Sequence, residues 1–135
     1  MKRIIYFGHP INTYHTELET KLIEKIARVF PKYAIENPNQ PKHQAGYIHC
    51  KKETGNGMQY YFEEVLPKCG IGIFLPFRDG AWGAGVFGEA KYFTQRDSSL
   101  WVWTIDAKAV VRLVRFGEVN HLSVQETRER ILLPY

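Results

Sequence analysis

Cysteine is scarce in this sequence, and its placement excludes the common cysteine-based motifs. The two cysteines, Cys50 and Cys69, form no C-x-x-C pair, so neither a paired-cysteine metal site nor a redox motif is predicted. His43 and His49 lie near Cys50 in the chain but also lack paired ligand spacing, and we expect no metal ion. Reduced thiols are typical of the cytosol, which predicts a cytoplasmic protein.

Long hydrophobic runs are also missing. The longest apolar stretches, such as residues 71–77, are far shorter than the ~20 residues that a membrane-spanning helix needs. The N-terminal stretch "MKRIIYFGHP" has a charged start but only a short apolar run before Gly8. It predicts a first strand and no signal peptide. We therefore expect no membrane partner.

No charge of one sign dominates the chain. There are 18 Lys and Arg against 14 Asp and Glu, a net charge of +4, and the basic residues are scattered apart from "ETRERI" near the C-terminus. This mild excess does not predict nucleic-acid binding. A length of 135 residues, without repeats or linkers, predicts one domain over residues 1–135.

What the sequence does contain is an alternation of strand-like and helix-like segments. Short β-branched and aromatic runs predict strands at residues 3–8, 33–38, 70–77, 100–105 and 109–116. Helical periodicity follows the capping-box spacings Thr16–Glu19 and Ser123–Glu126, and marks residues 58–66 and the segment ending near residue 95. The alternation predicts an α/β three-layer sandwich with a mainly parallel, flavodoxin/Rossmann-like five-stranded sheet.

Residues 39–57 fit neither pattern. The segment is polar, rich in turn-forming residues and without clear periodicity. It is long for a connection in a compact domain. It is therefore either a functional loop that helps to cover a site or an element that periodicity does not reveal.

The expected binding region lies beyond the carboxyl ends of the parallel strands, where α/β proteins bind their ligands. The loops after the first three predicted strands cover residues 8–14, 37–44 and 78–89. They hold the richest clusters of glycine, proline, amide and ionisable residues in the chain. We therefore expect the site to be built from these three loops.

The third loop runs into "GAWGAGVFGEAKYF", residues 80–93, where four glycines precede one carboxylate, Glu89. One interpretation is structural: the glycines allow tight helix packing, and Glu89 is a first-turn acid favoured by the helix dipole. The other is functional: glycine backbone lets a ligand approach closely, and amides at the helix start hold an anion. The spacing matches neither the Walker nor the Rossmann motif, which disfavours an NTPase.

The stretches "RIIYFGHPINTY" and "GIFLPFRDGAWGAGVFGEAKYF" together resemble the nucleoside 2-deoxyribosyltransferase family and its nucleoside-monophosphate hydrolase relatives. Members begin with a strand that ends in a Y-x-[AG]-G-P-like turn. They later show a G-T-x-x-E-I-G-x-A-like helix start whose glutamate is the nucleophile. The resemblance places Glu89 at the nucleophile position and Tyr6, Gly8 and Pro10 at the first-loop positions.

The resemblance implies cleavage of an N-glycosidic bond through an oxocarbenium-like state at C1′, which a carboxylate stabilises or captures covalently. Amides at the helix start are expected to keep Glu89 ionised. Asp79 is the candidate acid/base for the departing base. The expected substrate-binding residues lie in the three loops or beside them: Tyr6, Gly8, His9, Pro10, Asn37, Gln40, Trp82, Gly83 and Gly85. Trp82 either stacks on a nucleobase or folds back over the core.

The sequence also departs from the family pattern. An aspartate common at the start of the strand before the catalytic loop is absent at Cys69-Gly70, and Gly85-Val86 replaces the Gly-Thr pair. These departures leave two functions open: N-glycosidic bond cleavage or transfer on a nucleoside or nucleotide, or a non-catalytic nucleotide-binding module. Neither requires a cofactor. The resemblance also implies a homo-oligomer, with Tyr135 a candidate to enter a neighbouring subunit's site.

Overall fold

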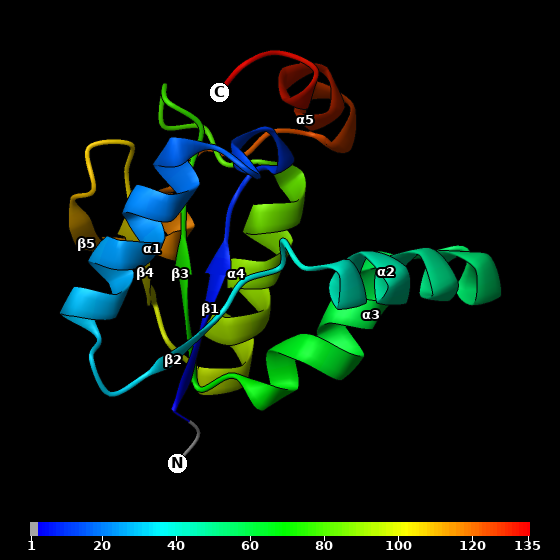
Figure 1. Ribbon diagram of the computed structural model, residues 1–135, viewed down its shortest axis with the longest axis horizontal. Coiled ribbons are helices and arrows are strands. Elements are labelled where there is room, and N and C mark those ends of the chain that lie inside the picture. The colour runs from blue at the N-terminus through cyan, green and yellow to red at the C-terminus, as the bar shows by residue number, and fades with distance from the viewer. Residues whose placement is uncertain (1–2) are drawn as a thin grey trace.

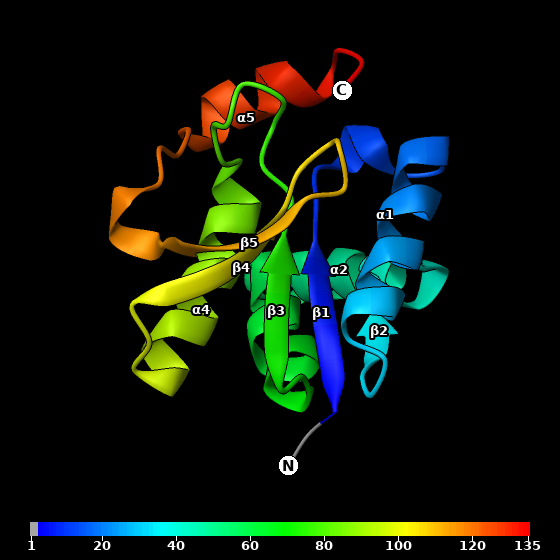
Figure 2. The same ribbon diagram turned by 90° about the vertical axis from the view of Figure 1, so that its left-hand side faces the viewer.

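A computed structural model describes residues 3–135, which form an α/β fold around one five-stranded sheet (Figures 1 and 2). The strands are β1 (Ile4–Gly8), β2 (Ala34–Glu36), β3 (Ile71–Phe74), β4 (Trp101–Ile105) and β5 (Val111–Arg115). Their order is β2-β1-β3-β4-β5, with β1 to β4 parallel and β5 antiparallel to β4. The predicted flavodoxin/Rossmann-like sandwich with a mainly parallel sheet is confirmed.

Helices cover both faces of the sheet. Helix α1 (Glu17–Val29) packs on one face, and α4 (Ala84–Asp97) packs on the other (Figure 1). Side chains alternate along β1, so Ile5 and Phe7 belong to the core beside α1 while Tyr6 belongs to the core beside α4. All three side chains are fully buried, which explains why the strand is hydrophobic at every position.

The segment 39–57 is largely a helix, α2 (Pro41–Thr54), so the loop interpretation is wrong. Pro41 opens the helix, and Gly55 ends it with a left-handed φ of 80°. Its only buried residue among those described is His43, because the helix projects from the side of the domain (Figure 1). A helix with so little buried surface needs no apolar stripe, and none is present in its sequence.

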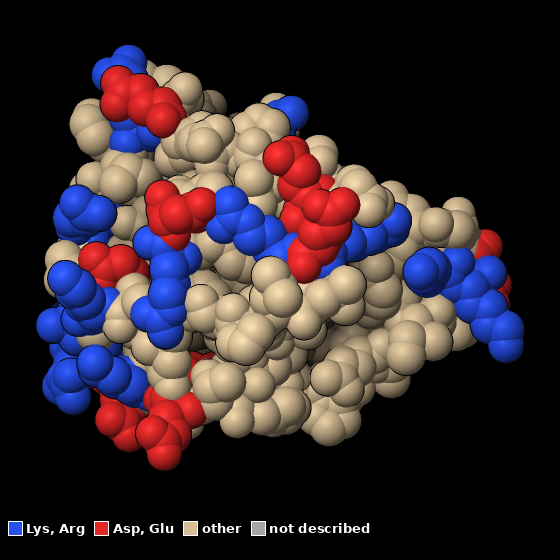
Figure 3. Space-filling view, turned by 90° about the horizontal axis from the view of Figure 1, so that it is seen from above, with Lys and Arg blue, Asp and Glu red and all other residues tan. Residues whose placement is uncertain are grey.

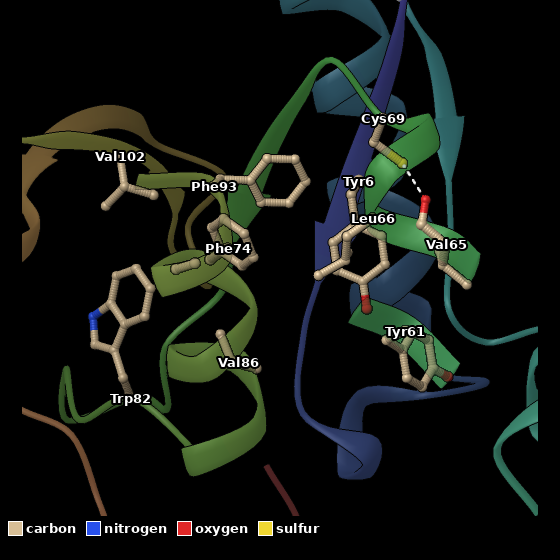
Figure 4. Close-up of a cluster of buried hydrophobic side chains, with 11 residues drawn as sticks. Tyr6, Tyr61, Val65, Leu66, Cys69, Phe74, Trp82, Val86, Phe93 and Val102 are labelled. Carbon is tan, nitrogen blue, oxygen red and sulfur yellow. Dashed lines mark hydrogen bonds between the residues drawn. The ribbon is translucent and has the colours of Figure 1, made fainter. Parts of the chain in front are cut away.

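Three short helical turns follow α2 and lead into β3. They are α3 (Met58–Tyr60), the π-helical turn η2 (Tyr61–Val65) and the 3₁₀ turn η3 (Leu66–Lys68). They occupy the segment where the sequence predicted one helix over residues 58–66. Tyr61, Val65 and Leu66 point into the core beside α4 (Figure 4).

The C-terminal segment crosses over the carboxyl ends of the strands (Figures 1 and 2). It follows the 3₁₀ turn η4 (Phe116–Glu118) and contains α5 (Val124–Ile131), whose predicted capping box between Ser123 and Glu126 is formed. Tyr135 packs on its own chain: its hydroxyl donates to the carbonyl of Pro76, and its ring stacks on Phe77. Within residues 3–135 no helix is long and apolar enough to cross a membrane.

Candidate functional site

A cavity of about 440 Å³ opens at the carboxyl ends of β1 and β3. In the order β2-β1-β3-β4-β5 the chain leaves β1 toward one edge of the sheet and β3 toward the other, so this is the topological switch point where ligands bind in such folds. Figure 3 looks onto this edge of the molecule. It shows a wide area without Lys, Arg, Asp or Glu side chains, bordered by a band of charged ones.

Glu89 is the one carboxylate among the described residues that line the cavity. It is the sixth residue of α4 and is buried. The hydroxyl of Tyr6 donates a hydrogen bond to Oε2 of Glu89. Beside them, a methyl group on Gly8 would lie 3.0 Å from Oε1 of Glu89 and 2.6 Å from the Phe74 ring. The absence of a side chain at Gly8 therefore leaves the space that the carboxyl group fills.

Burial raises the pKa of Glu89 to about 8, and the hydrogen bond from Tyr6 lowers it only in part. The expectation that helix-start amides keep this carboxyl ionised is wrong, because Glu89 lies in the second turn of α4 and away from water. The structural interpretation of Glu89 as a first-turn acid favoured by the helix dipole is also wrong, since the first turn of α4 contains no acidic residue.

Tyrosine rings form much of the wall around Glu89. Tyr14, Tyr47 and Tyr61 line the cavity together with Tyr6, and Tyr6 and Tyr61 meet edge to face at 6.4 Å between ring centroids. Figure 4 shows the Tyr6 hydroxyl pointing between Val86 of α4 and Tyr61 of η2. Burial raises the pKa of Tyr14 and of Tyr61, with the Glu89 charge contributing. Both phenols therefore stay protonated and present hydrogen-bond donors to the cavity.

His9 and Glu19 form a buried pair at the cavity wall. Nε2 of His9 lies 2.7 Å from Oε2 of Glu19, and Nδ1 lies 2.8 Å from the carbonyl oxygen of Phe7. Glu19 also accepts hydrogen bonds from Asn39 and from the amide of His15. Burial alone would raise the pKa of Glu19, but these donors together lower it. One carboxylate thus joins the loop after β1, the start of α1 and the loop after β2.

The cap of α1 differs from the predicted capping box because of this pair. Thr16 accepts a hydrogen bond from the amide of Glu19, as predicted. The Glu19 side chain bonds to His9 and to the amide of His15, one residue before the expected position. The hydrogen bond expected from the Thr16 amide to the Glu19 side chain is therefore replaced by contacts of Glu19 with the His15 amide and with His9, which lines the cavity.

Six of the predicted site residues line the cavity, and five do not. Those that line it are Tyr6, His9, Pro10, Gly83, Gly85 and Glu89. Gly8 is not part of the lining but lies next to Glu89, where its lack of a side chain leaves room for the carboxyl group. Asn37 and Gln40 lie outside its lining: the Asn37 side chain accepts from the amide of Asn39, and Gln40 donates to Glu36 at the end of β2. Asp79 and Trp82 line a separate hollow of about 420 Å³ next to β5.

Asp79 is exposed and ion-paired instead of facing Glu89. Its Oδ2 lies 2.7 Å from the guanidinium of Arg130, and its Oδ1 accepts from the amide of Ala81. The hydrogen bond from Arg130 is the main reason that its pKa falls to about 2. A carboxyl group so strongly ionised is poorly suited to donate a proton near neutral pH.

Trp82 is 3 % exposed and packs on Phe74, with ring centroids 6.0 Å apart. Its backbone pairs with residues 120–122 of the C-terminal segment. Of its two interpretations, the structure therefore supports the ring folded back over the core (Figure 4).

The glycines before Glu89 have different roles. Gly80 has a left-handed φ of 91° and turns the loop. Gly83 and Gly85 line the cavity, and a methyl group on Gly85 would meet nothing within 4 Å. Because α4 begins here, its first turn forms part of the cavity wall, and its Ala84 amide donates to Thr127 of α5.

Several lining residues were not among the individual site residues predicted from the sequence. They come from α2, the turns around it, and α5: Gln44, Tyr47, Ile48, Met58, Thr127 and Ile131. Helix α2 has no apolar periodicity, and α5 reaches the site only because the C-terminal segment folds back over the sheet. Proximity between Glu89 and residues this distant in the chain is a property of the tertiary structure.

No family model, curated protein or solved structure matches this chain. Among residues 3–135, no group of three or more His, Cys, Asp or Glu side chains is placed to hold a metal ion. The chemistry of the site therefore has to be argued from Glu89 and its surroundings.

Proposed function

We propose that the protein cleaves or transfers the N-glycosidic bond of a nucleoside or nucleoside 5′-monophosphate, with Glu89 as the nucleophile. The observation that carries this proposal is the burial of a single carboxyl group against Tyr6 at the wall of an aromatic cavity. The cavity volume falls within the ~300–1,000 Å³ of small-molecule sites. The sequence resemblance described above supports the same reaction.

In the proposed reaction, an oxygen of ionised Glu89 attacks C1′ of the sugar. The C1′–N bond breaks, its electron pair leaves with the base, and the base nitrogen takes a proton from water in the open cavity. A second base then attacks the glycosyl ester through its nitrogen and loses a proton to the solvent, which completes transfer, or water attacks and loses a proton, which completes hydrolysis. The carboxylate of Glu89 is regenerated in either case.

The surrounding rings suit the base of such a substrate. Tyr14, Tyr47 and Tyr61 offer faces on which a heterocycle stacks, and their hydroxyls offer donors to its polar edge. Asp79 has no part in this proposal because it lies outside the cavity lining. His9 contributes shape more than proton transfer, because both of its ring nitrogens already face acceptors.

The second candidate is a non-catalytic nucleotide-binding module that uses the same cavity. The observation that favours it is the burial of Glu89, which raises its pKa to about 8 and so favours the protonated carboxyl group at neutral pH. A neutral carboxyl group both donates and accepts hydrogen bonds and is a good partner for the edge of a base. It is a poor nucleophile until it loses its proton.

The deciding experiment incubates the purified chain at pH 8.5 with deoxynucleosides, ribonucleosides and their 5′-monophosphates, and measures free base by chromatography. An enzyme releases base, Glu89→Gln abolishes the release, and Glu24→Gln, on the exposed surface of α1, retains it. A binding module releases no base, yet calorimetry detects a nucleoside bound to both wild type and Glu89→Gln. If neither release nor binding occurs, both candidates are wrong.

The quaternary structure and cellular location belong to the same proposal. We propose a cytoplasmic homo-oligomer, as the resemblance implies. Light scattering coupled to size-exclusion chromatography measures the mass in solution directly. A mass near 15.7 kDa, that of one chain, would contradict the oligomer.

A further inference from the structure

Among the residues that the structure describes, the cavity around Glu89 offers no free cationic side chain to a phosphate group, because both ring nitrogens of His9 already contact Phe7 and Glu19. None of its described lining residues is Lys or Arg, and its ionisable side chains are Glu89, His9 and tyrosines. Proteins hold phosphate groups with Arg or Lys, or with free amides at a helix start. At the start of α4, the Ala84 amide donates to Thr127 and is not available to a phosphate group. An ionised Glu89 would moreover repel a phosphate group bound beside it.

The mouth of the cavity is apolar and open to water. Ile11 from η1 (Ile11–Thr13) and Ile48 from α2 both line it, although their side chains are 61 % and 65 % exposed. Pro10, Pro38 and Met58 add further apolar surface at the same cavity. Exposed apolar side chains gathered at one opening are typical of a binding surface.

Core packing does not account for Ile48 of α2, which is 65 % exposed. Helix α2 buries His43 alone among its described residues and projects from the domain. Tyr47 is half-buried against Tyr61, at 6.4 Å between ring centroids, and Ile48, one residue on, reaches the cavity mouth. Tyr47 therefore packs at the edge of the core as well as lining the cavity, whereas the Ile48 side chain lines the cavity without being buried.

We propose that the substrate of Glu89 is a nucleoside without phosphate whose base carries an apolar substituent, and that this substituent lies between Ile11 and Ile48. The proposal rests on the proposed function, since it names the substrate class of the same site. The sugar has to reach Glu89 at the inner wall, so the base extends outward past the tyrosines. A substituent on the base then meets the isoleucines and removes their side chains from water.

The test compares matched substrates on the full chain. The substrates are 2′-deoxyadenosine and 2′-deoxyuridine, each with and without a hexyl group on the base, and the 5′-monophosphates of the two parents. Base release gives kcat/KM, and calorimetry gives Kd for the same compounds. The variants are Ile48→Asn and the control Leu100→Asn, because Leu100 is 61 % exposed and lies outside both cavities.

We expect the hexyl compound of the preferred base to exceed its parent by about tenfold in kcat/KM, and each monophosphate to fall below its parent. Ile48→Asn should lower kcat/KM for the hexyl compound by about three- to tenfold more than it lowers kcat/KM for the parent compound. Leu100→Asn should match wild type in all rates. Equal rates for hexyl and parent compounds, or a monophosphate as the best substrate, would overturn the inference while leaving the proposed function intact.

If no compound releases base, the proposed function fails, and the calorimetric arm alone decides the inference. Tighter binding of a hexyl compound than of its parent, lost in Ile48→Asn and kept in Leu100→Asn, would support an apolar-substituted ligand for a binding module. Equal affinities, or no binding of any compound, would overturn it.

Discussion

The hydroxyl of Tyr6 on β1 donates a hydrogen bond to the carboxyl group of Glu89 on α4, 83 residues further along the chain. Both groups are buried, so neither finds a partner in bulk water. This contact couples strand β1 to the one carboxyl group among the described residues of the cavity lining. The proton on Glu89 is therefore sensitive to changes on β1.

The first prediction concerns the pH dependence of catalysis. Because attack requires ionised Glu89, whose pKa is about 8, kcat/KM for base release should rise with pH and level off above about 8. Tyr6→Phe removes the hydrogen bond that favours the ionised form, so the rise should move to higher pH. Tyr33→Phe, at the far side of the sheet beside α1, should follow wild type. An unchanged profile in Tyr6→Phe would contradict the coupling.

The second prediction concerns stability. The pKa of Glu89 is about 8 in the folded state and near its ordinary value of 4.5 in the unfolded state. Between these pH values the folded state binds a proton that the unfolded state has lost, so the free energy of unfolding falls as pH rises from 4.5 to 8 and then levels off. Measured by urea denaturation, the free energy of unfolding of Glu89→Gln relative to that of wild type should increase across this pH range by on the order of a few kcal/mol.

The control for that measurement is Glu24→Gln, which removes an exposed carboxyl group of α1. Its stability difference from wild type should be small and independent of pH over the same range. A Glu89→Gln curve parallel to that of wild type would show that the carboxyl group ionises normally in the folded protein.

The third prediction tests the space beside the carboxyl group. Gly8→Ala would place a methyl group 2.6 Å from Phe74 and 3.0 Å from Glu89, so we expect a loss of about 1–3 kcal/mol in stability. Base release should fall as Glu89 is displaced. Gly85→Ala meets nothing within 4 Å and should leave the melting temperature unchanged or slightly raised, since alanine favours helix. Equal melting temperatures for the two variants would refute the close packing at Gly8.

The fourth prediction concerns Glu19 as the link between three loops. Glu19→Ala leaves the donors of His9 and Asn39 without their acceptor, which should cost about 2–4 kcal/mol. Glu17→Ala, exposed on the same helix, should cost far less. Because the pKa of folded Glu19 lies below its ordinary 4.5, its stabilising contribution is present above pH 4.5 and is lost in acid. Chemical denaturation should therefore show a smaller difference in the free energy of unfolding between Glu19→Ala and wild type in acid than at pH 7.

The fifth prediction separates Asp79 from the chemistry. Its pair with Arg130 is largely exposed, and such pairs contribute little to stability. Asp79→Asn should therefore leave both the melting temperature and the rate of base release close to wild type. A large loss of rate with unchanged stability would return Asp79 to the role of acid/base that the sequence suggested.

The position of the site could be predicted because it depends on chain order. Parallel strands bring the ends of β1 and β3 to one edge of the sheet. This topology places Tyr6, His9 and Glu89 in the same region, independently of the direction of their side chains. Side-chain direction within a loop could not be predicted. Asp79 turns outward to Arg130, and Trp82 turns inward to Phe74, although only three positions separate them.

Local features and long-range features of this protein therefore have different origins. The sequence by itself determined the five strands, helices α1, α4 and α5, and the edge of the sheet that holds the site, because strand hydrophobicity, helical periodicity and capping act over a few residues. Only the tertiary structure decided that α2 is a helix at the cavity mouth and that Glu89 is buried against Tyr6 and Gly8 with a raised pKa. Burial and desolvation depend on which distant segments of the chain come into contact. Local sequence patterns span only a few residues and do not predict such contacts.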